Sequence, residues 1–210
     1  MNTNSKTRNL VLMSLIAAIL FLMAYTPLGY LNIGPLSITF NMIPVAVAAI
    51  AMGPSGGAAA GAIFGLTSFL HALKGAGMTG ILFSISPVLT AVLCFGPRML
   101  DGFVLGYIFR GLNRKMHPAL SCAVTGFFSA FLNTAFFMSA IVIFFGNTNY
   151  VKELMDGRNV ILFICAFVGV NAVFEMISST MLTSAVGTAL IKAHLINRNG
   201  AGPSARAQMV

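Results

Sequence analysis

Long apolar runs separated by short polar breaks make up most of this chain. A bilayer core of about 30 Å requires about 20 apolar residues in each helix that crosses it. Six stretches meet or approach that length, and each predicts one membrane span: residues 9–26, 38–52, 56–72, 80–109, 118–145 and 159–192. The second and third stretches are short, so we expect one of them to be tilted, re-entrant or shielded by its neighbours.

The breaks between the runs carry residues that end helices. The first break, TPLGYLNIGPLS, holds two prolines and two glycines and predicts a structured loop. The five residues Gly53–Gly57 leave room only for a tight turn between two helices. Residues 146–159 form the one long polar excursion. The small, polar residues 196–210 predict a disordered tail after a single domain over residues 1–195.

Composition identifies the class of protein. The chain is 58% hydrophobic and 8% charged, with a mean hydropathy of +0.91, which leaves too few polar residues to cover a soluble core. We therefore predict an all-α, polytopic membrane protein with a six-helix transmembrane bundle. The net charge of +8 would suggest nucleic acid in a soluble chain. Here the cations lie between apolar runs, so we expect no nucleic-acid partner.

The distribution of the cations predicts the orientation in the bilayer. With six spans and the N-terminus inside, eight cations lie in cytoplasmic segments and three in outer loops. The inner set is Lys6, Arg8, Arg110, Arg114, Lys115, Lys192, Arg198 and Arg206, and the outer set is Lys74, Lys152 and Arg158. Cytoplasmic loops carry the excess of Lys and Arg in membrane proteins, so both termini should be cytoplasmic.

The third stretch and the turn before it carry a stripe of glycines at every fourth position. Its members are Gly53, Gly57, Gly61 and Gly65. Small residues at this spacing let a second helix approach closely, which is how helices associate in lipid. We interpret the stripe as a packing surface.

The region Pro27–Leu70 carries motifs that resemble a known family. A Gly/Pro loop ending in IGPLSIT is followed by IPV, a GP..G turn and G..FG..SF. This order resembles the substrate-binding S components of energy-coupling factor (ECF) vitamin transporters, and the local motif resembles most the pantothenate-type subgroup. The six spans and the basic loop after the fourth agree with it.

The resemblance implies a function. An S component captures its vitamin outside, docks on a membrane T component driven by two cytoplasmic ATPases, and reorients in the bilayer to release the vitamin inside. It implies a bacterial plasma membrane, no enzymatic activity and no cofactor. The sequence contains no G-x-x-x-x-G-K-[ST] phosphate loop of its own. Members of the family dock through small residues four apart on the first helix, where this chain has Ser14 and Ala18 instead of two alanines.

Polar side chains inside apolar spans are costly and usually face a cavity or a partner. Arg98 lies well inside the fourth stretch and requires an anion. One candidate is Asp101, three residues on and on the same helix face. The other is the carboxylate of a substrate, bound bidentately. Both can hold at once, with Asp101 orienting Arg98 for the ligand.

Further candidate ligand-binding residues lie in the loop and spans that line the site in this family. Asn133 is a lone amide in a Phe-rich helix and suits either a hydroxyl or amide ligand or an interhelical hydrogen bond. Asn171 and Glu175 are four apart on one face of the last helix, and Glu175 could pair with Arg98 or accept from a ligand hydroxyl.

The outer end of the bundle supplies three more candidates. His71, beside Lys74, could attract an anionic vitamin, although a basic pair at a helix end also anchors a helix at the interface. Tyr30 and Asn32 could form a lid over the site. Neither the three widely spaced cysteines nor the histidines have the spacing of metal ligands, so we expect no metal.

The chain has no Trp and four Tyr, which disfavours a flat polycyclic ligand. A small carboxylate with hydroxyl and amide groups, such as pantothenate, suits an Arg and an Asn better. Riboflavin or a pyridoxine-like vitamin is the alternative substrate. A polytopic membrane enzyme is a distant alternative, because no nucleophile-elbow or paired-histidine motif is present. A structural membrane subunit is another, and it predicts that Arg98 and Asp101 simply satisfy each other.

Overall fold

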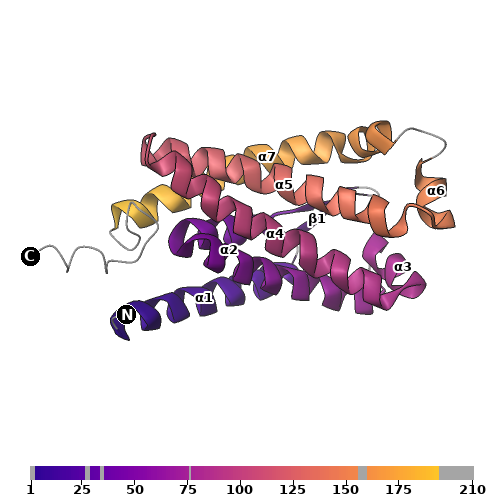
Figure 1. Ribbon diagram of the computed structural model, residues 1–210, viewed down its shortest axis with the longest axis horizontal. Coiled ribbons are helices and arrows are strands. Elements are labelled where there is room, and N and C mark those ends of the chain that lie inside the picture. Colours follow the sequence, from indigo (N-terminus) through magenta and orange to yellow (C-terminus); the bar gives the residue numbers. More distant parts are fainter. Residues whose placement is uncertain (1–2, 27–28, 34–35, 76, 156–159, 194–210) are drawn as a thin grey trace, which may run out of the picture.

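The structure is a computed structural model that describes residues 3–26, 29–33, 36–75, 77–155 and 160–193. Helices dominate it (Figure 1). In chain order the elements are α1 (Thr3–Ala24), β1 (Tyr30–Ile33), β2 (Leu36–Thr39), α2 (Met42–Leu73), α3 (Gly77–Ile85), α4 (Pro87–Asn113), α5 (Pro118–Phe145), α6 (Asn149–Met155) and α7 (Val160–Lys192). The predicted tail, 196–210, lies outside the described residues.

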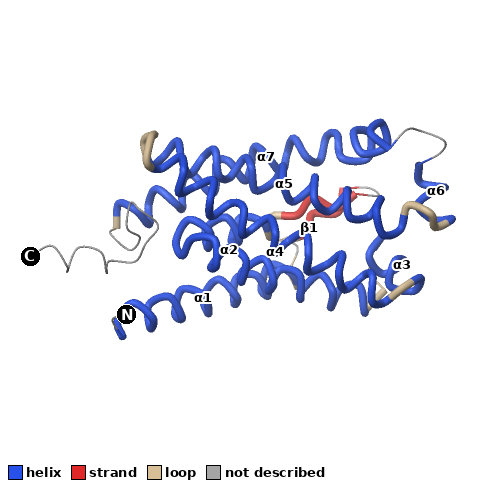
Figure 2. Tube along the Cα trace, in the orientation of Figure 1, coloured by secondary structure: helices blue, strands red, loops and turns tan. Residues whose placement is uncertain are grey.

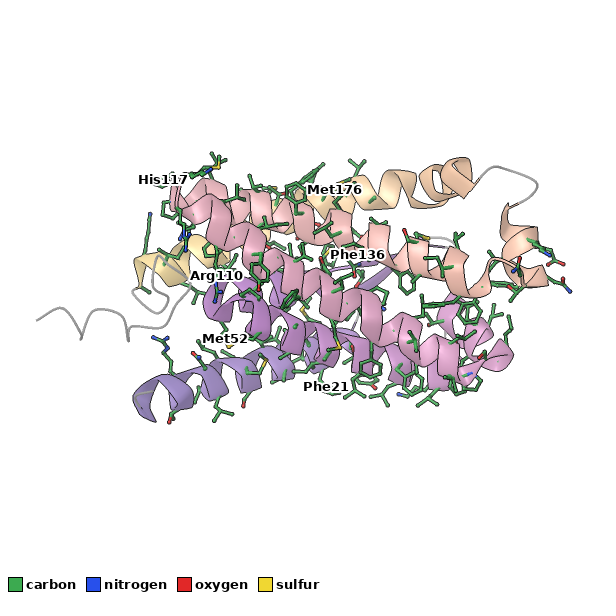
Figure 3. All side chains as sticks on the ribbon, in the orientation of Figure 1. Phe21, Met52, Arg110, His117, Phe136 and Met176 are labelled. Carbon is green, nitrogen blue, oxygen red and sulfur yellow. The ribbon has the colours of Figure 1, made fainter. Side chains whose placement is uncertain are left out.

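The long helices are apolar enough to cross a membrane. Among the described residues, five helices contain such a segment: α1, α2, α4, α5 and α7. Large apolar side chains project from their outer faces (Figure 3), and Val88 and Ile143 are 73% and 75% exposed. Such surfaces suit lipid rather than water. The prediction of an all-α polytopic membrane protein is confirmed.

The helix α2 is broken into two arms at Gly53. This residue has φ +75° and ψ −162°, which is not helical, and Pro54 follows it. The chain then doubles back, because Gly56 and Gly57 come against Ala48 and Ala49. The tight turn predicted at this place is confirmed. The first arm, residues 42–52, is about 16 Å long at 1.5 Å per residue, roughly half of a bilayer core.

Two predicted boundaries are wrong. The stretch 80–109 is divided into α3 and α4, because Ser86 caps α4 by accepting a hydrogen bond from Leu89 N at 3.5 Å and Pro87 follows as its first residue. The stretch 38–52 becomes helical only at Met42, because its first residues belong to β2. The polar excursion also contains the helix α6, which is not predicted from the sequence.

The loop after α1 folds into an antiparallel hairpin. Tyr30 pairs with Thr39 and Ile33 with Leu36. The hydrogen bond from Phe40 N to Gly29 O, 3.1 Å long, closes the base of this hairpin. Figure 2 shows the two strands in red among the helices, and β2 packs against α7. The hairpin therefore adds a short two-stranded sheet that packs against the last helix.

The glycine stripe of α2 packs directly on α4. A Cβ on Gly57 would collide with the backbone of Gly102, and one on Gly61 would collide with the carbonyl of Arg98. Gly65 similarly lies against the backbone at Cys94. The interpretation of the stripe as a packing surface is confirmed, and the close approach sets the position of the Arg98 backbone.

The start of α1 and the end of α7 lie at the same end of the bundle (Figure 1). Met52, Arg110 and His117 also lie towards this end (Figure 3). This arrangement agrees with termini on one side of the membrane. Which side that is stays a prediction from the distribution of cations.

Candidate functional site

Arg98 lies in the interior of the bundle, with 8% of its surface exposed. Its Nη1 donates to the carbonyl oxygens of Cys94 at 3.1 Å and Leu93 at 3.5 Å, both on its own helix. The guanidinium carbon lies 4.7 Å from the ring centroid of Phe64 and 4.8 Å from that of Phe137. The Nε atom is buried without a hydrogen-bond partner. The two rings therefore hold a cation whose donors are only partly used.

Asp101 does not neutralise Arg98 through an ion pair. It is 2% exposed, and its Oδ1 is buried without a hydrogen-bond partner. Among the described residues, no carboxylate lies within ion-pair distance of Arg98. Of the two anions expected for Arg98, the internal carboxylate is not bonded to it.

Asn133 lies on the same side of α5 as Phe137, one helical turn away. It is 8% exposed and its Oδ1 is buried without a partner. One turn earlier, Ser129 donates to the carbonyl oxygen of Met42 at 3.2 Å. Asn133 therefore lies between the start of α2 and the ring that covers Arg98. An unused amide oxygen at this depth can accept a hydrogen bond from a ligand.

Glu175 is bonded to the hairpin instead of to Arg98. Its Oε1 accepts a hydrogen bond from Thr39 N at 2.7 Å, and the residue is 7% exposed. Thr39 and Glu175 are 136 positions apart in the sequence. The bond ties the end of β2 to α7, so Glu175 holds the hairpin against the last helix.

Asn41 is a buried polar residue for which no role was predicted from the sequence. This residue directly precedes α2 and is fully buried, and neither Oδ1 nor Nδ2 has a hydrogen-bond partner. A buried amide without partners is uncommon and costly. The signal was visible as an Asn immediately before an apolar run, but such a residue is usually a helix cap.

The polar groups gather around the start of α2. Asn41 is the neighbour of Met42, which Ser129 contacts, and lies two residues after Thr39, which Glu175 contacts. The same region also contains an apolar cluster of Met42, Ile43 and Ala130, with Phe40 and Met176 packed on it. The short first arm of α2 thus begins among polar groups from α5 and α7.

The side chain of His71 contacts residues at the end of α1. Its Nε2 lies 2.8 Å from the carbonyl oxygen of Ala24, and its ring stacks on Tyr25 at 5.3 Å between centroids. Lys74 lies 4.5 Å from the centroid of the same tyrosine ring. His71 and Lys74 therefore join the end of α2 to the end of α1.

Three candidates lie where side chains are outside the described part of the structure. The backbones of Tyr30 and Asn32 belong to β1, opposite Thr39 and Ser37. The backbone of Asn171 belongs to α7, one turn before Glu175. The register places Tyr30 and Asn32 on the hairpin that Glu175 tethers.

Ser14 and Ala18 lie on the exposed face of α1. The opposite face packs through Ile16 and Leu20 on both arms of α2. Leu15 and Leu22 extend the exposed face and are each 58% exposed. Because this face is exposed, lipid or another subunit can cover it.

Comparison with known proteins gives consistent results. A family model described as "ECF transporter, substrate-specific component" matches residues 8–187. The pantothenate transporter PanT of Leuconostoc mesenteroides is 30% identical over 199 residues, which cover 90% of this chain and 95% of that protein. The pantothenic acid transporter PanT of Lactococcus lactis subsp. cremoris is 26% identical over 201 residues, with 90% and 96% covered.

Proposed function

The chain belongs to the substrate-specific components of ECF transporters, and from this premise we propose that it binds pantothenate and delivers it across a bacterial plasma membrane. Membership makes it a transporter subunit rather than an enzyme. The choice of pantothenate is supported by the two relatives named after it. It is also supported by the chemistry of the buried polar groups.

Arg98 is the residue proposed to bind the carboxylate of the vitamin. Its buried guanidinium has an unused Nε and no carboxylate within ion-pair distance in the described part of the chain, and this observation carries the proposal. A guanidinium matches a carboxylate through two parallel hydrogen bonds, which are stronger than neutral ones. The Phe64 and Phe137 rings pack on the guanidinium, and Asp101, buried three residues further along α4, is proposed to orient it for the ligand.

The other polar residues are proposed to bind or enclose the rest of the molecule. Pantothenate carries hydroxyl and amide groups beyond its carboxylate, and Asn133 has a free acceptor for such a donor. Asn171 lies one turn from Glu175 on α7. Tyr30 and Asn32 belong to the hairpin that Glu175 tethers, so the hairpin is the lid of this site.

A titration calorimetry experiment tests the function directly. The purified full chain in detergent is titrated with pantothenate, riboflavin, pyridoxine and thiamine. We expect pantothenate to bind with submicromolar Kd and the other three to bind at least 100-fold more weakly. Tight binding of riboflavin or pyridoxine would instead assign the alternative substrate, and no binding of any vitamin would contradict the proposal.

The exposed face of α1 is proposed to contact the T component of a complex with two ATPase subunits. Ser14 and Ala18 are small, exposed and four apart, so another helix can approach the α1 backbone there. We expect Ser14→Leu and Ala18→Leu each to reduce co-purification with the T component at least tenfold while leaving vitamin binding unchanged.

A matched control lies on the same helix. Leu15→Ala removes bulk from the exposed face without adding any, so assembly should persist. Co-expression with the T component and ATPases, followed by affinity purification, measures the effect. Unchanged assembly in both leucine variants would remove this face from the docking surface.

A further inference from the structure

Asn41 is fully buried in the bundle with both atoms of its amide group unpartnered. A carboxamide offers two donors and an acceptor with two lone pairs. Leaving these unmet in an apolar interior is among the costlier arrangements in a folded protein. The side chain must therefore serve something other than the stability of the empty protein.

Helix capping does not explain Asn41. An N-cap Asn normally accepts a hydrogen bond from the N–H of the second or third helical residue. Here the third residue is Pro44, which has no N–H, and the second, Ile43, donates instead to Phe40 O at 3.0 Å. Asn41 accordingly makes no side-chain capping bond. The local sequence therefore rules out helix capping as the role of Asn41.

Neighbouring contacts place Asn41 among the candidate ligand-binding groups. On one side, Met42 O accepts from Ser129, one turn before Asn133 on α5. On the other, Thr39 N donates to Glu175 on α7. A Cβ on Gly29 would lie 3.1 Å from Asn41 Oδ1, so the base of the hairpin closes directly over the amide.

We propose that the Asn41 carboxamide binds the neutral amide and hydroxyl groups of the vitamin, away from the carboxylate that Arg98 holds. The inference rests on the proposed function, because it assigns one part of that ligand to one residue. A side chain that both donates and accepts suits an amide or hydroxyl and discriminates strongly against a ligand that lacks them. Asn41 would thus determine specificity for the neutral groups of the vitamin, and Arg98 would attract its carboxylate.

The test compares two ligands and two positions in detergent by titration calorimetry. Pantothenol, in which an alcohol replaces the carboxylate of pantothenate, retains the amide and hydroxyl groups. We expect Asn41→Leu to raise the Kd of pantothenate and of pantothenol by a similar factor, on the order of 10- to 100-fold. Arg98→Gln should lower the affinity for pantothenate and leave the affinity for pantothenol nearly unchanged. Asn147→Leu, an exposed Asn after α5, is the matched control and should bind both ligands as the unchanged protein does.

Thermal unfolding without ligand separates binding from structure. Replacing an unpartnered buried amide with Leu should leave the Tm of the empty protein equal or higher, while affinity falls. A lower Tm in both Asn41→Leu and Asn41→Ala would indicate a structural role and overturn the inference. Unchanged affinity for both ligands would also overturn it and leave the pantothenate function intact. Failure of the unsubstituted protein to bind pantothenate would instead contradict the function itself.

Discussion

Arg98→Gln should lower the affinity for pantothenate by a factor of about 100 or more. A carboxylate enclosed in an apolar bundle without its cation loses two charge-assisted hydrogen bonds and stays desolvated, which costs about 3–5 kcal/mol. Gln keeps a polar side chain but is neutral and shorter, so the loss reports the charge and the reach of the guanidinium together. Titration calorimetry of the purified protein measures it.

Two comparisons sharpen this expectation. Arg98→Lys keeps the charge but not the planar fork, and should recover only part of the affinity. Arg114→Gln removes an exposed cation from the turn after α4 and should leave Kd unchanged. If Arg98→Gln and Arg114→Gln bind pantothenate equally well, Arg98 does not hold the carboxylate, and its buried charge would need another anion.

Local chemistry explains which features could be predicted from the sequence. The turn at Gly53 requires a left-handed glycine followed by proline, and both residues stand in the sequence. The cost of a charge in an apolar span singled out Arg98 without any knowledge of its neighbours. The hairpin was also accessible, because YLNI and LSIT alternate around a Gly-Pro pair. It was interpreted only as a structured loop.

Long-range contacts explain what the sequence did not predict. Nothing in the sequence indicates that Thr39 bonds Glu175, since 136 positions separate them. The role of Asn41 was not predicted, because it depends on whether the backbone N–H groups near it already donate to other acceptors. The division at Ser86 was missed because hydropathy stays high across it, although Ser followed by Pro is a helix-start signal. Hydropathy alone therefore does not indicate the boundary between α3 and α4.

Gly61→Ala should destabilise the protein by about 1–3 kcal/mol and reduce pantothenate binding with it. The added methyl group would collide with the carbonyl oxygen of Arg98, so the backbones of α2 and α4 must separate. Because the obstacle is backbone, no side-chain rotation relieves it. The Arg98 backbone then shifts, and with it the guanidinium held between Phe64 and Phe137.

Gly96→Ala provides the matched control for this substitution. Gly96 lies on α4 close to Arg98, but a Cβ there meets no atom within 4 Å. The same change should leave stability equal or raise it by about 0.5–1 kcal/mol, since Ala favours helix over Gly. Thermal unfolding in detergent measures Tm, and calorimetry measures Kd. Equal Tm and Kd in the two variants would show that the glycine stripe does not position Arg98, and the orientation of this residue would then depend on the aromatic rings and on its hydrogen bonds to Leu93 and Cys94.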